Sequence, residues 1–458
     1  MKSMTYKVLT ASLIATGMFL GGCNSSSFTD PIPDPTPTPG ASLTDSYNES
    51  SYGVVSAATV YDWVTDWEVN RPEHIGAEGR LFIIQFNTAM SGSSDFKYIK
   101  HNGESVITVD SGFHEFSETR NDGVSDFPSS LPKGETMDAG LAKLGINPNE
   151  DMLLFVSGDG KGLMGAARLW FTMSYWGVDE KNMALMNGSA IHQFQPNNAI
   201  VSDLGEIFEA TASTLPVADP SAFSVKNLSR DTISLNASMQ DMMDLVKGDS
   251  DDYLVVDARA ANEYSGEKVS ATEDDSCLVE GEEVNKANKQ CFSAFTGHIK
   301  GAANINYTTL YNGDDHVQNG DLNGDGIVDN ADASATFKRK TDLEAIYATA
   351  GYDGEKKLYT YCRTGARASI NSFVQMQILG YETAMYDASW VQWGKMADRL
   401  NKDGLYNLAV DSEWRTDVEQ YSDAVTYHPN NLKVNPINGV KPEGISTQAI
   451  ILEDEGYL

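Results

Sequence analysis

Positive charge is scarce in this sequence. Its 458 residues include 33 Lys and Arg against 65 Asp and Glu, a formal net charge of −32 at pH 7. Such an acidic excess argues against nucleic acid or an anionic lipid surface as a binding partner. It suits an exported, highly solvated protein, and it leaves a cationic partner open.

Cysteine is also scarce, at four residues in the whole chain. Apart from Cys23 near the N-terminus, three remain, so at least one cannot join an intramolecular disulfide. In an oxidising compartment Cys277 and Cys291 would close a modest loop, stabilising the fold by roughly 3 kcal/mol and leaving Cys362 free. Two unrelated thiols, or a resolving role toward Cys362, are the alternatives.

The apolar run near the N-terminus, residues 8–20, is too short to span a membrane stably. Two lysines precede it, which is typical of a secretory signal. Residues 20–23 (LGGC) resemble a bacterial lipobox, which implies that Cys23 is the lipidated N-terminus of the mature protein. Asn24, rather than an aspartate, follows this cysteine, which resembles the sequence of lipoproteins that are sorted to the outer membrane. The expected location is therefore the cell envelope, by a lipid anchor, on either the periplasmic or the surface face; an ordinary signal with a stray cysteine is the alternative.

Strands and helices alternate after this leader. Residues 81–86 and 152–156 read as buried strands, and 137–144 as a helix that stops at Gly145. A further helix is expected over 396–400. This alternation indicates an α/β fold built on a parallel sheet.

One stretch, residues 358–369 (LYTYCRTGARAS), carries the candidate chemistry. A β-rich run ends at Cys362, a short loop follows, and a helical pattern covers 368–379. Backbone N–H groups of a tight loop at a helix N-terminus bind an anion and favour a thiolate over a thiol. This predicts a nucleophilic cysteine in an anion cradle. The residues of the predicted cradle are Arg363, Thr364, Gly365, Ala366 and Arg367. A buried structural thiol is the alternative.

The loop is one residue shorter than that of phosphatases of the Cys-x5-Arg type. Four residues separate Cys362 from Arg367. The smaller cradle suits a single sulfur atom, which disfavours a phosphatase or an arsenate reductase.

Around this loop the sequence resembles the rhodanese (thiosulfate sulfurtransferase) family. Residues 253–259 (YLVVDAR) with 263–266 (EYSG) look like its first signature, and 297–305 (GHIKGAANI) is similar to the run that follows. Residues 386–394 (YDASWVQWG) resemble the element behind the active loop. The motifs occur in the family's order over residues 225–405.

The resemblance implies two tandem rhodanese-like domains, each a parallel sheet flanked by helices. An inactive domain over 50–215 has Asp159 where the nucleophile would stand. A catalytic domain over 222–405 carries insertions at 267–296 and 312–335. The expected order also includes the signal peptide 1–23, the Ser/Pro-rich tether 24–49 and a C-terminal extension, 406–458, without a functional interpretation.

The family implies sulfur transfer from thiosulfate or a similar donor to a thiophilic acceptor, through a persulfide on Cys362 and without a catalytic cofactor. Glu263 stands where some two-domain members place a substrate-binding arginine, which makes 3-mercaptopyruvate a poorer candidate than thiosulfate. The alternative is an envelope lipoprotein that binds or carries sulfur or a chalcogen oxyanion, with little turnover, for respiratory partners.

The second insertion contains a loop, residues 321–332 (DLNGDGIVDNAD), with oxygen ligands at the spacing of a calcium site. It resembles the dockerin variant of the EF-hand, because its last position is aspartate and no clear entering helix precedes it. The predicted ligands are Asp321, Asn323, Asp325, the Ile327 carbonyl, Asp329 and Asp332. The expected role of calcium is structural, and a solvated acidic loop is the alternative.

Overall fold

All residues described in the computed structural model belong to the unit Pro39–Leu458. The described residues are Tyr47 and 51–86, 97–110, 116–121, 126–214, 223–228, 230, 232–247, 252–265, 295–313, 334–396, 425–427 and 448–458. The predicted lipidation site Cys23, the tether apart from Tyr47, Cys277, Cys291 and the calcium loop 321–332 lie outside these residues.

The first half of the chain forms a five-stranded sheet in which every pairing is parallel. Its strands are nearly continuous apolar runs, and β2 is buried at every position, as expected for a parallel sheet covered on both faces. In spatial order the strands are β1 (Gly53–Val55), β8 (Met183–Ser189), β7 (Met152–Ser157), β2 (Leu81–Phe86) and β4 (Val106–Asp110).

The α-helices described in this half are α1 (Ala57–Thr65), α2 (Trp67–Asn70), α3 (Gly134–Leu144), α4 (Leu163–Tyr175) and α5 (Ala190–Gln193). Alternate strand residues enter two separate cores, one that includes Val60 and Trp63 of α1 and one that includes Leu169 and Trp170 of α4. Helix α3 ends at Gly145, which has φ of 71°, as the sequence predicts.

The second half forms a four-stranded parallel sheet. Its spatial order is β12 (Ala303–Asn304), β10 (Tyr253–Asp257), β15 (Lys357–Tyr361) and β16 (Thr383–Met385). A single parallel bridge joins Asn236 to Met385 at its edge. The helices are α6 (Met239–Lys247), α7 (Ala261–Tyr264), α9 (Lys340–Thr349), α10 (Ala366–Phe373) and α11 (Ser389–Met396).

The two sheets follow the same strand pattern. The order β4-β2-β7-β8 in the first sheet corresponds to β12-β10-β15-β16 in the second, and β1 occupies the edge where Asn236 bridges to Met385. In each sheet a long helix, α4 or α10, follows the third strand of this series. The prediction of an α/β fold with parallel sheets is therefore confirmed.

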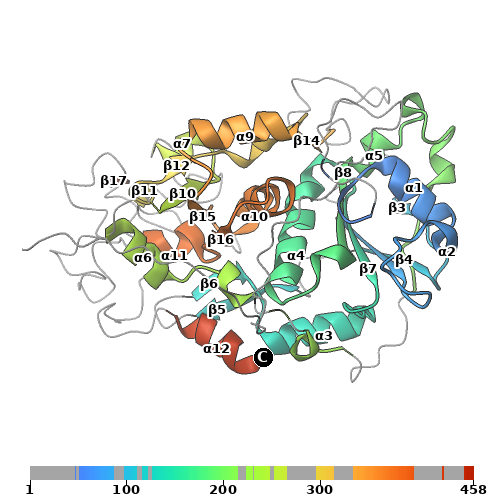
Figure 1. Cartoon of the computed structure of the whole chain (residues 1–458), viewed down its shortest axis with the longest axis horizontal. Coiled ribbons are helices and arrows are strands. Elements are labelled where there is room, and N and C mark those ends of the chain that lie inside the picture. The colour runs from blue at the N-terminus through green and yellow to red at the C-terminus, as the bar shows by residue number, and fades with distance from the viewer. Residues whose placement is uncertain are drawn as a thin grey trace, which may run out of the picture. The chain divides into compact units, whose positions relative to one another are not determined.

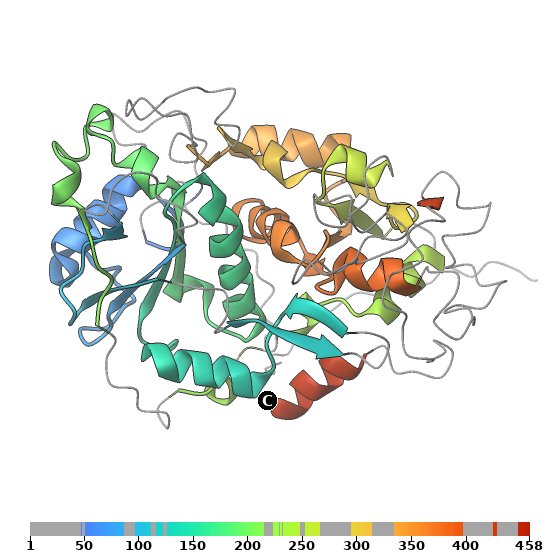
Figure 2. The ribbon, with the colours of Figure 1, turned by 180° about the vertical axis from the view of Figure 1, so that it is seen from behind.

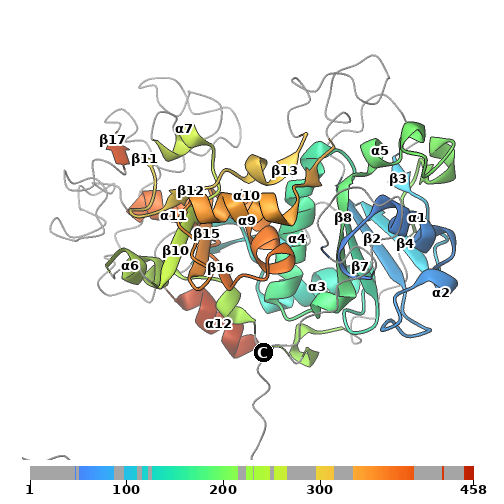
Figure 3. The same ribbon diagram turned by 45° about the horizontal axis from the view of Figure 1, so that its top comes forward.

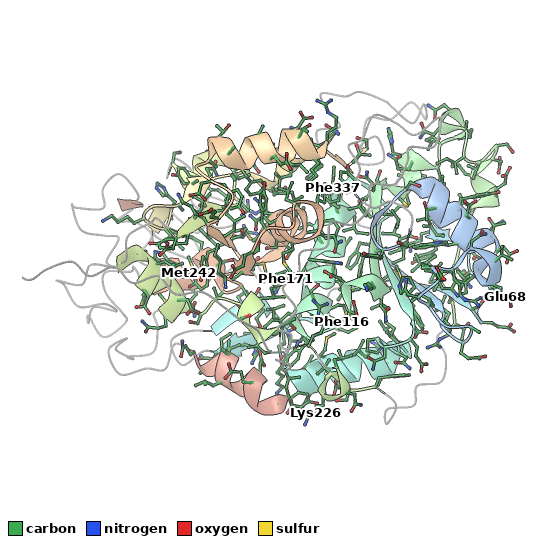
Figure 4. All side chains as sticks on the ribbon, viewed as in Figure 1. Glu68, Phe116, Phe171, Lys226, Met242 and Phe337 are labelled. Atoms are coloured by element: carbon green, nitrogen blue, oxygen red, sulfur yellow. The ribbon has the colours of Figure 1, made fainter. Side chains whose placement is uncertain are left out.

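Helices α4 and α10 pack against each other between the two sheets, as both views of the ribbon show (Figures 1 and 2). The rings of Trp170 and Phe373 meet edge to face with centroids 4.8 Å apart. Phe171 and Phe337 lie in this central core, whereas Met242 belongs to the core on the far side of the second sheet (Figure 4). One shared core thus joins α4, which follows β7, to α10, which follows β15.

Four short antiparallel pairings complete the strands: β3 (Tyr98–Ile99) with β9 (Phe208–Glu209), β5 (Glu118–Asn121) with β6 (Asp126–Ser130), β11 (Phe295–Gly297) with β17 (Val425–Tyr427), and β13 (Tyr311–Asn312) with β14 (Thr336–Phe337). The last pair brings together the two chain segments on either side of the second predicted insertion.

Two helix predictions near the candidate site need correction. The helix predicted over 368–379 begins earlier, at Ala366, and changes at Val374 into a π-helical turn, Val374–Ile378. Of the helix predicted over 396–400, only Met396 is described. It is the last residue of α11 (Ser389–Met396), so this helix begins before the predicted start, and 397–400 lie outside the described residues. Ser389, the first residue of this helix, has a positive φ of 54°.

A C-terminal helix, α12 (Ala449–Tyr457), lies near α3 (Figure 3), and Tyr457 donates a hydrogen bond to Asp138 of α3 at 2.7 Å. Its Asp454 is fully buried, 2.8 Å from Arg120, and accepts a hydrogen bond from Tyr175 at 2.6 Å. Burial raises the pKa of Asp454, and the Arg120 guanidinium opposes that shift. This C-terminal helix thus contributes to the folded core.

In the part of the chain that the structure describes, no helix combines the length and apolarity needed to cross a membrane.

Candidate active site

Cys362 directly follows the last residue of β15, at the carboxyl end of the second sheet. Helix α10 begins four residues later, at Ala366, so the loop leads straight into a helix N-terminus. The cysteine is 1% exposed and is free of disulfide bonds. The strand, loop and helix that the sequence predicts around Cys362 are therefore present.

Gly365 sets the shape of this loop. It precedes α10 with φ of 82°, a conformation that side chains other than glycine rarely adopt. A Cβ here would lie 2.5 Å from Asp387 Oδ1 and 2.7 Å from Arg168 Nη1. The loop backbone thus approaches a buried ion pair so closely that only glycine fits.

Ser389 holds the loop from behind. Its Oγ accepts hydrogen bonds from the N–H groups of Cys362, at 3.2 Å, and Gly365, at 3.1 Å, and donates to the Tyr386 carbonyl at 2.8 Å. Ser389 is fully buried with φ of 54°, a strained conformation for a non-glycine residue. One hydroxyl therefore fixes both ends of the loop that carries the thiol.

Replacing Ser389 by alanine is expected to destabilise the protein by about 1–3 kcal/mol for each buried N–H that loses its acceptor. The free energy of unfolding in urea measures this. Ser369→Ala is the matched control, because its Oγ donates to the Gly365 carbonyl, which also accepts from the Ser369 N–H. Equal losses in the two variants would contradict the anchoring role of Ser389.

Arg367, on the first turn of α10, pairs with Glu263 of α7. Its Nη1 and Nη2 reach the two Glu263 oxygens at 2.5 and 3.1 Å, a bidentate arrangement. Burial alone would lower the pKa of Arg367, but the Glu263 hydrogen bonds and the charge of Cys362 raise it. The Glu263 carboxylate therefore holds this guanidinium at the start of α10.

Arg168 reaches the loop from α4 in the first half of the chain. Its Nη1 lies 2.6 Å from Asp387 Oδ1, and these side chains are 2% and 3% exposed. Its Nη2 donates to the Ser129 carbonyl at 2.8 Å, while Asp387 Oδ2 accepts the Leu131 N–H at 2.7 Å. The first half thereby supports the loop directly.

A third buried pair, Arg259 with Asp257, lies beside the strand that leads to Cys362. The two side chains are fully buried, with Nη2 and Oδ2 2.6 Å apart, and Arg259 Nη2 also donates to the Gly297 carbonyl at 2.5 Å. Tyr361 donates to Asp257 at 2.7 Å, and burial with the nearby Asp257 charge raises its pKa. The guanidinium of Arg259 stacks over the Trp390 ring, 4.6 Å from its centroid.

The predicted cradle residues lie together around Cys362, with Arg363, Thr364, Ala366 and Arg367 half-buried and Gly365 buried. Their roles in binding a donor stay a prediction. Sequence reasoning did not identify Ser389, Asp387 and Arg168 as site residues. Ser389 and Asp387 stand within the motif at 386–394, which was the available signal, whereas Arg168 had none.

The corresponding loop of the first half has no thiol. Asp159 stands two residues after the end of β7, whereas Cys362 follows β15 directly. The buried carboxylate of Asp159 accepts hydrogen bonds from the N–H groups of Lys161 and Gly162. A Cβ on Gly162 would lie 2.4 Å from the Phe86 carbonyl, so the backbone itself fills this loop. Among the described residues no cluster of three or more His, Cys, Asp or Glu suits a metal ion.

A buried cysteine at the carboxyl end of a parallel strand, directly before a short loop and a helix N-terminus, characterises one class of α/β proteins. Residues 238–396 match the rhodanese-like domain family. This match places a rhodanese-like domain in the second half of the chain.

Three comparisons with known proteins agree with this match. A Haloferax volcanii protein named "Putative thiosulfate sulfurtransferase" is 26% identical over 249 residues, 54% of this chain and 68% of that protein. The sulfur carrier protein TtuD of Thermus thermophilus is 26% identical over 275 residues, 60% of this chain and 76% of that protein. A persulfide form of EanB with ergothioneine has a TM-score of 0.50 and 16% identity, covering 73% of this chain and 67% of EanB. The likeness to EanB concerns the fold, and the relatives' names support sulfur transfer in general.

Proposed function

We propose that this protein is a sulfurtransferase that moves a sulfane sulfur from thiosulfate or a similar donor to a thiophilic acceptor through a persulfide on Cys362. The observation that supports it is the position of the thiol, directly after β15 and before the glycine-containing loop at the N-terminus of α10.

In the proposed first step, the Cys362 thiolate attacks the outer sulfur of thiosulfate. The bond between the two donor sulfurs breaks, sulfite leaves with its electron pair, and Cys362 retains the outer sulfur as a persulfide. An acceptor such as cyanide or a thiolate then attacks the terminal sulfur and regenerates the Cys362 thiolate. No net oxidation is required, and no metal takes part.

We assign stabilisation of the persulfide anion to loop N–H groups other than the two that Ser389 accepts. Arg363 and Arg367 are the proposed contacts for the oxidised end of the donor. Because Cys362 is 1% exposed, the donor approaches from the half-buried side of the loop, where Arg363 and Thr364 lie.

Intact mass of residues 24–458, before and after thiosulfate, tests the proposal. We expect a gain of about 32 mass units, removed by cyanide with catalytic formation of thiocyanate, because a persulfide adds one sulfur atom. Absence of both the gain and thiocyanate formation would refute sulfur transfer from this donor. Hydrolysis of a chromogenic phosphate ester would instead indicate a phosphatase.

A second candidate is a sulfur carrier with little turnover, and the relative named as a sulfur carrier favours it. Its signature would be a persulfide that forms in full but reacts slowly with cyanide and thiols. Selenium and arsenic oxyanions, such as selenite and arsenite, with pull-down of envelope partners, extend the test to other cargo.

The cellular setting is part of the proposal. We propose a lipid anchor at Cys23, an envelope location and a structural calcium ion on the 321–332 loop, with small sulfur compounds as substrates and envelope redox proteins as partners. We also propose that 50–215 and 222–405 are tandem domains of one fold, which the matching strand orders support.

A further inference from the structure

Three arginines around the active loop are each paired with a carboxylate at 2.5–2.6 Å. Arg168–Asp387 and Arg259–Asp257 are sealed, with side chains 0–3% exposed. Arg367–Glu263 is the outermost pair, with side chains 17% and 9% exposed. An incoming donor can therefore approach Glu263 and Arg367, whereas the other two pairs are closed to it.

Glu263 is held toward Arg367 by its own helix. It occupies the third position of α7, where its Oε2 also accepts the Ala260 N–H at 3.3 Å. Both carboxylate oxygens contact the guanidinium. Freeing Arg367 for a donor would therefore require breaking two charge-assisted hydrogen bonds and turning Glu263 away from a helix cap.

Pairing with Glu263 changes the net charge that Arg367 presents to a substrate. A lone guanidinium beside Cys362 would attract a dianion, but a guanidinium bound to a carboxylate presents a nearly neutral group with negative charge at one edge. In a partly desolvated site this edge repels a second anionic oxygen more strongly than it would in water. The repulsion grows with the charge of the donor.

We propose that Glu263 determines donor specificity: by holding Arg367, it disfavours sulfane donors with two negative charges relative to donors with one or none. This rests on the proposed sulfurtransferase function and narrows its substrate class. Thiosulfate is then a usable but handicapped donor, and a sulfane sulfur on a singly charged or neutral carrier is the preferred one.

Two donors with the same reacting bond separate charge from chemistry. Thiosulfate is a dianion, and benzenethiosulfonate is a monoanion that also carries a sulfane sulfur on an oxidised sulfur. Glu263→Gln keeps an oxygen acceptor for Arg367 but removes the charge. We expect kcat/KM for thiosulfate to rise about tenfold, mainly through KM, and that for benzenethiosulfonate to change by no more than about threefold.

Glu453→Gln is the matched control, since it removes the same charge from a pair with Arg120 on the C-terminal helix, where Glu453 is 56% exposed. It should leave the ratio of the two kcat/KM values unchanged. Glu263→Ala provides a second variant, in which the ratio should move in the same direction.

An unchanged donor ratio in both Glu263 variants, with turnover intact, would overturn the specificity role alone. A ratio that shifts equally in Glu453→Gln would also overturn it, because net charge would then be the cause. If the wild-type protein transfers sulfur from neither donor, the proposed function itself fails.

Discussion

Substitution of Cys362 by serine is expected to abolish sulfur transfer, lowering kcat by about 10³-fold or more, because a hydroxyl neither ionises at neutral pH nor forms a persulfide. Ser and Cys differ little in size, and the position is 1% exposed, so the loop should keep its hydrogen bonds to Ser389. Thiocyanate formation and the intact mass after thiosulfate measure the effect together.

The other cysteines supply the control. Cys277→Ser and Cys291→Ser should retain the mass gain and the turnover, because the proposed cycle uses one thiol. Retained transfer in Cys362→Ser would disprove the mechanism. Loss of transfer in either of the other variants would instead support a resolving thiol.

Replacing Arg168 by methionine is expected to destabilise the protein by about 3–5 kcal/mol, because it leaves the buried Asp387 carboxylate without its counter-charge. Asp387 is 3% exposed and would keep only the Leu131 N–H among the contacts described above. Since Gly365 lies against this pair, the loop that carries Cys362 should also lose order and turnover should fall. Urea unfolding monitored by tryptophan fluorescence measures the free energy.

A double variant separates the lost charge from the lost packing. Arg168→Met with Asp387→Asn should recover part of the stability, because no unpaired charge remains in the core. Arg339→Met is the matched control, since its pair with Asp342 has side chains 54% and 45% exposed and should contribute under about 1 kcal/mol. Similar small losses in Arg168→Met and Arg339→Met would show that the buried pair is dispensable.

Much of the site could be predicted from neighbouring residues alone. The apolar run before Cys362 predicts the strand, Gly365 predicts the turn, and the helix-forming residues after Gly365 predict the helix. Each of these preferences depends on a few neighbouring residues, so all three elements follow from local propensity. The same holds for β2, a run of buried apolar residues, and for α3, which ends at Gly145. The start of α11 was missed because positive φ at Ser389 breaks the usual local preference.

The charge of the site could not be predicted in this way. Glu263 and Arg367 lie 104 positions apart, and Arg168 and Asp387 come from different halves of the chain. Which arginine meets which carboxylate depends on how α7 and α4 pack against the helix and strand ends around Cys362, and no short-range pattern encodes that packing. The sequence therefore determined where the thiol, its turn and its helix lie, because those follow from local backbone preferences. Only the tertiary structure decided which charges surround the thiol, because burial forces each guanidinium to find a carboxylate wherever the packed elements place one.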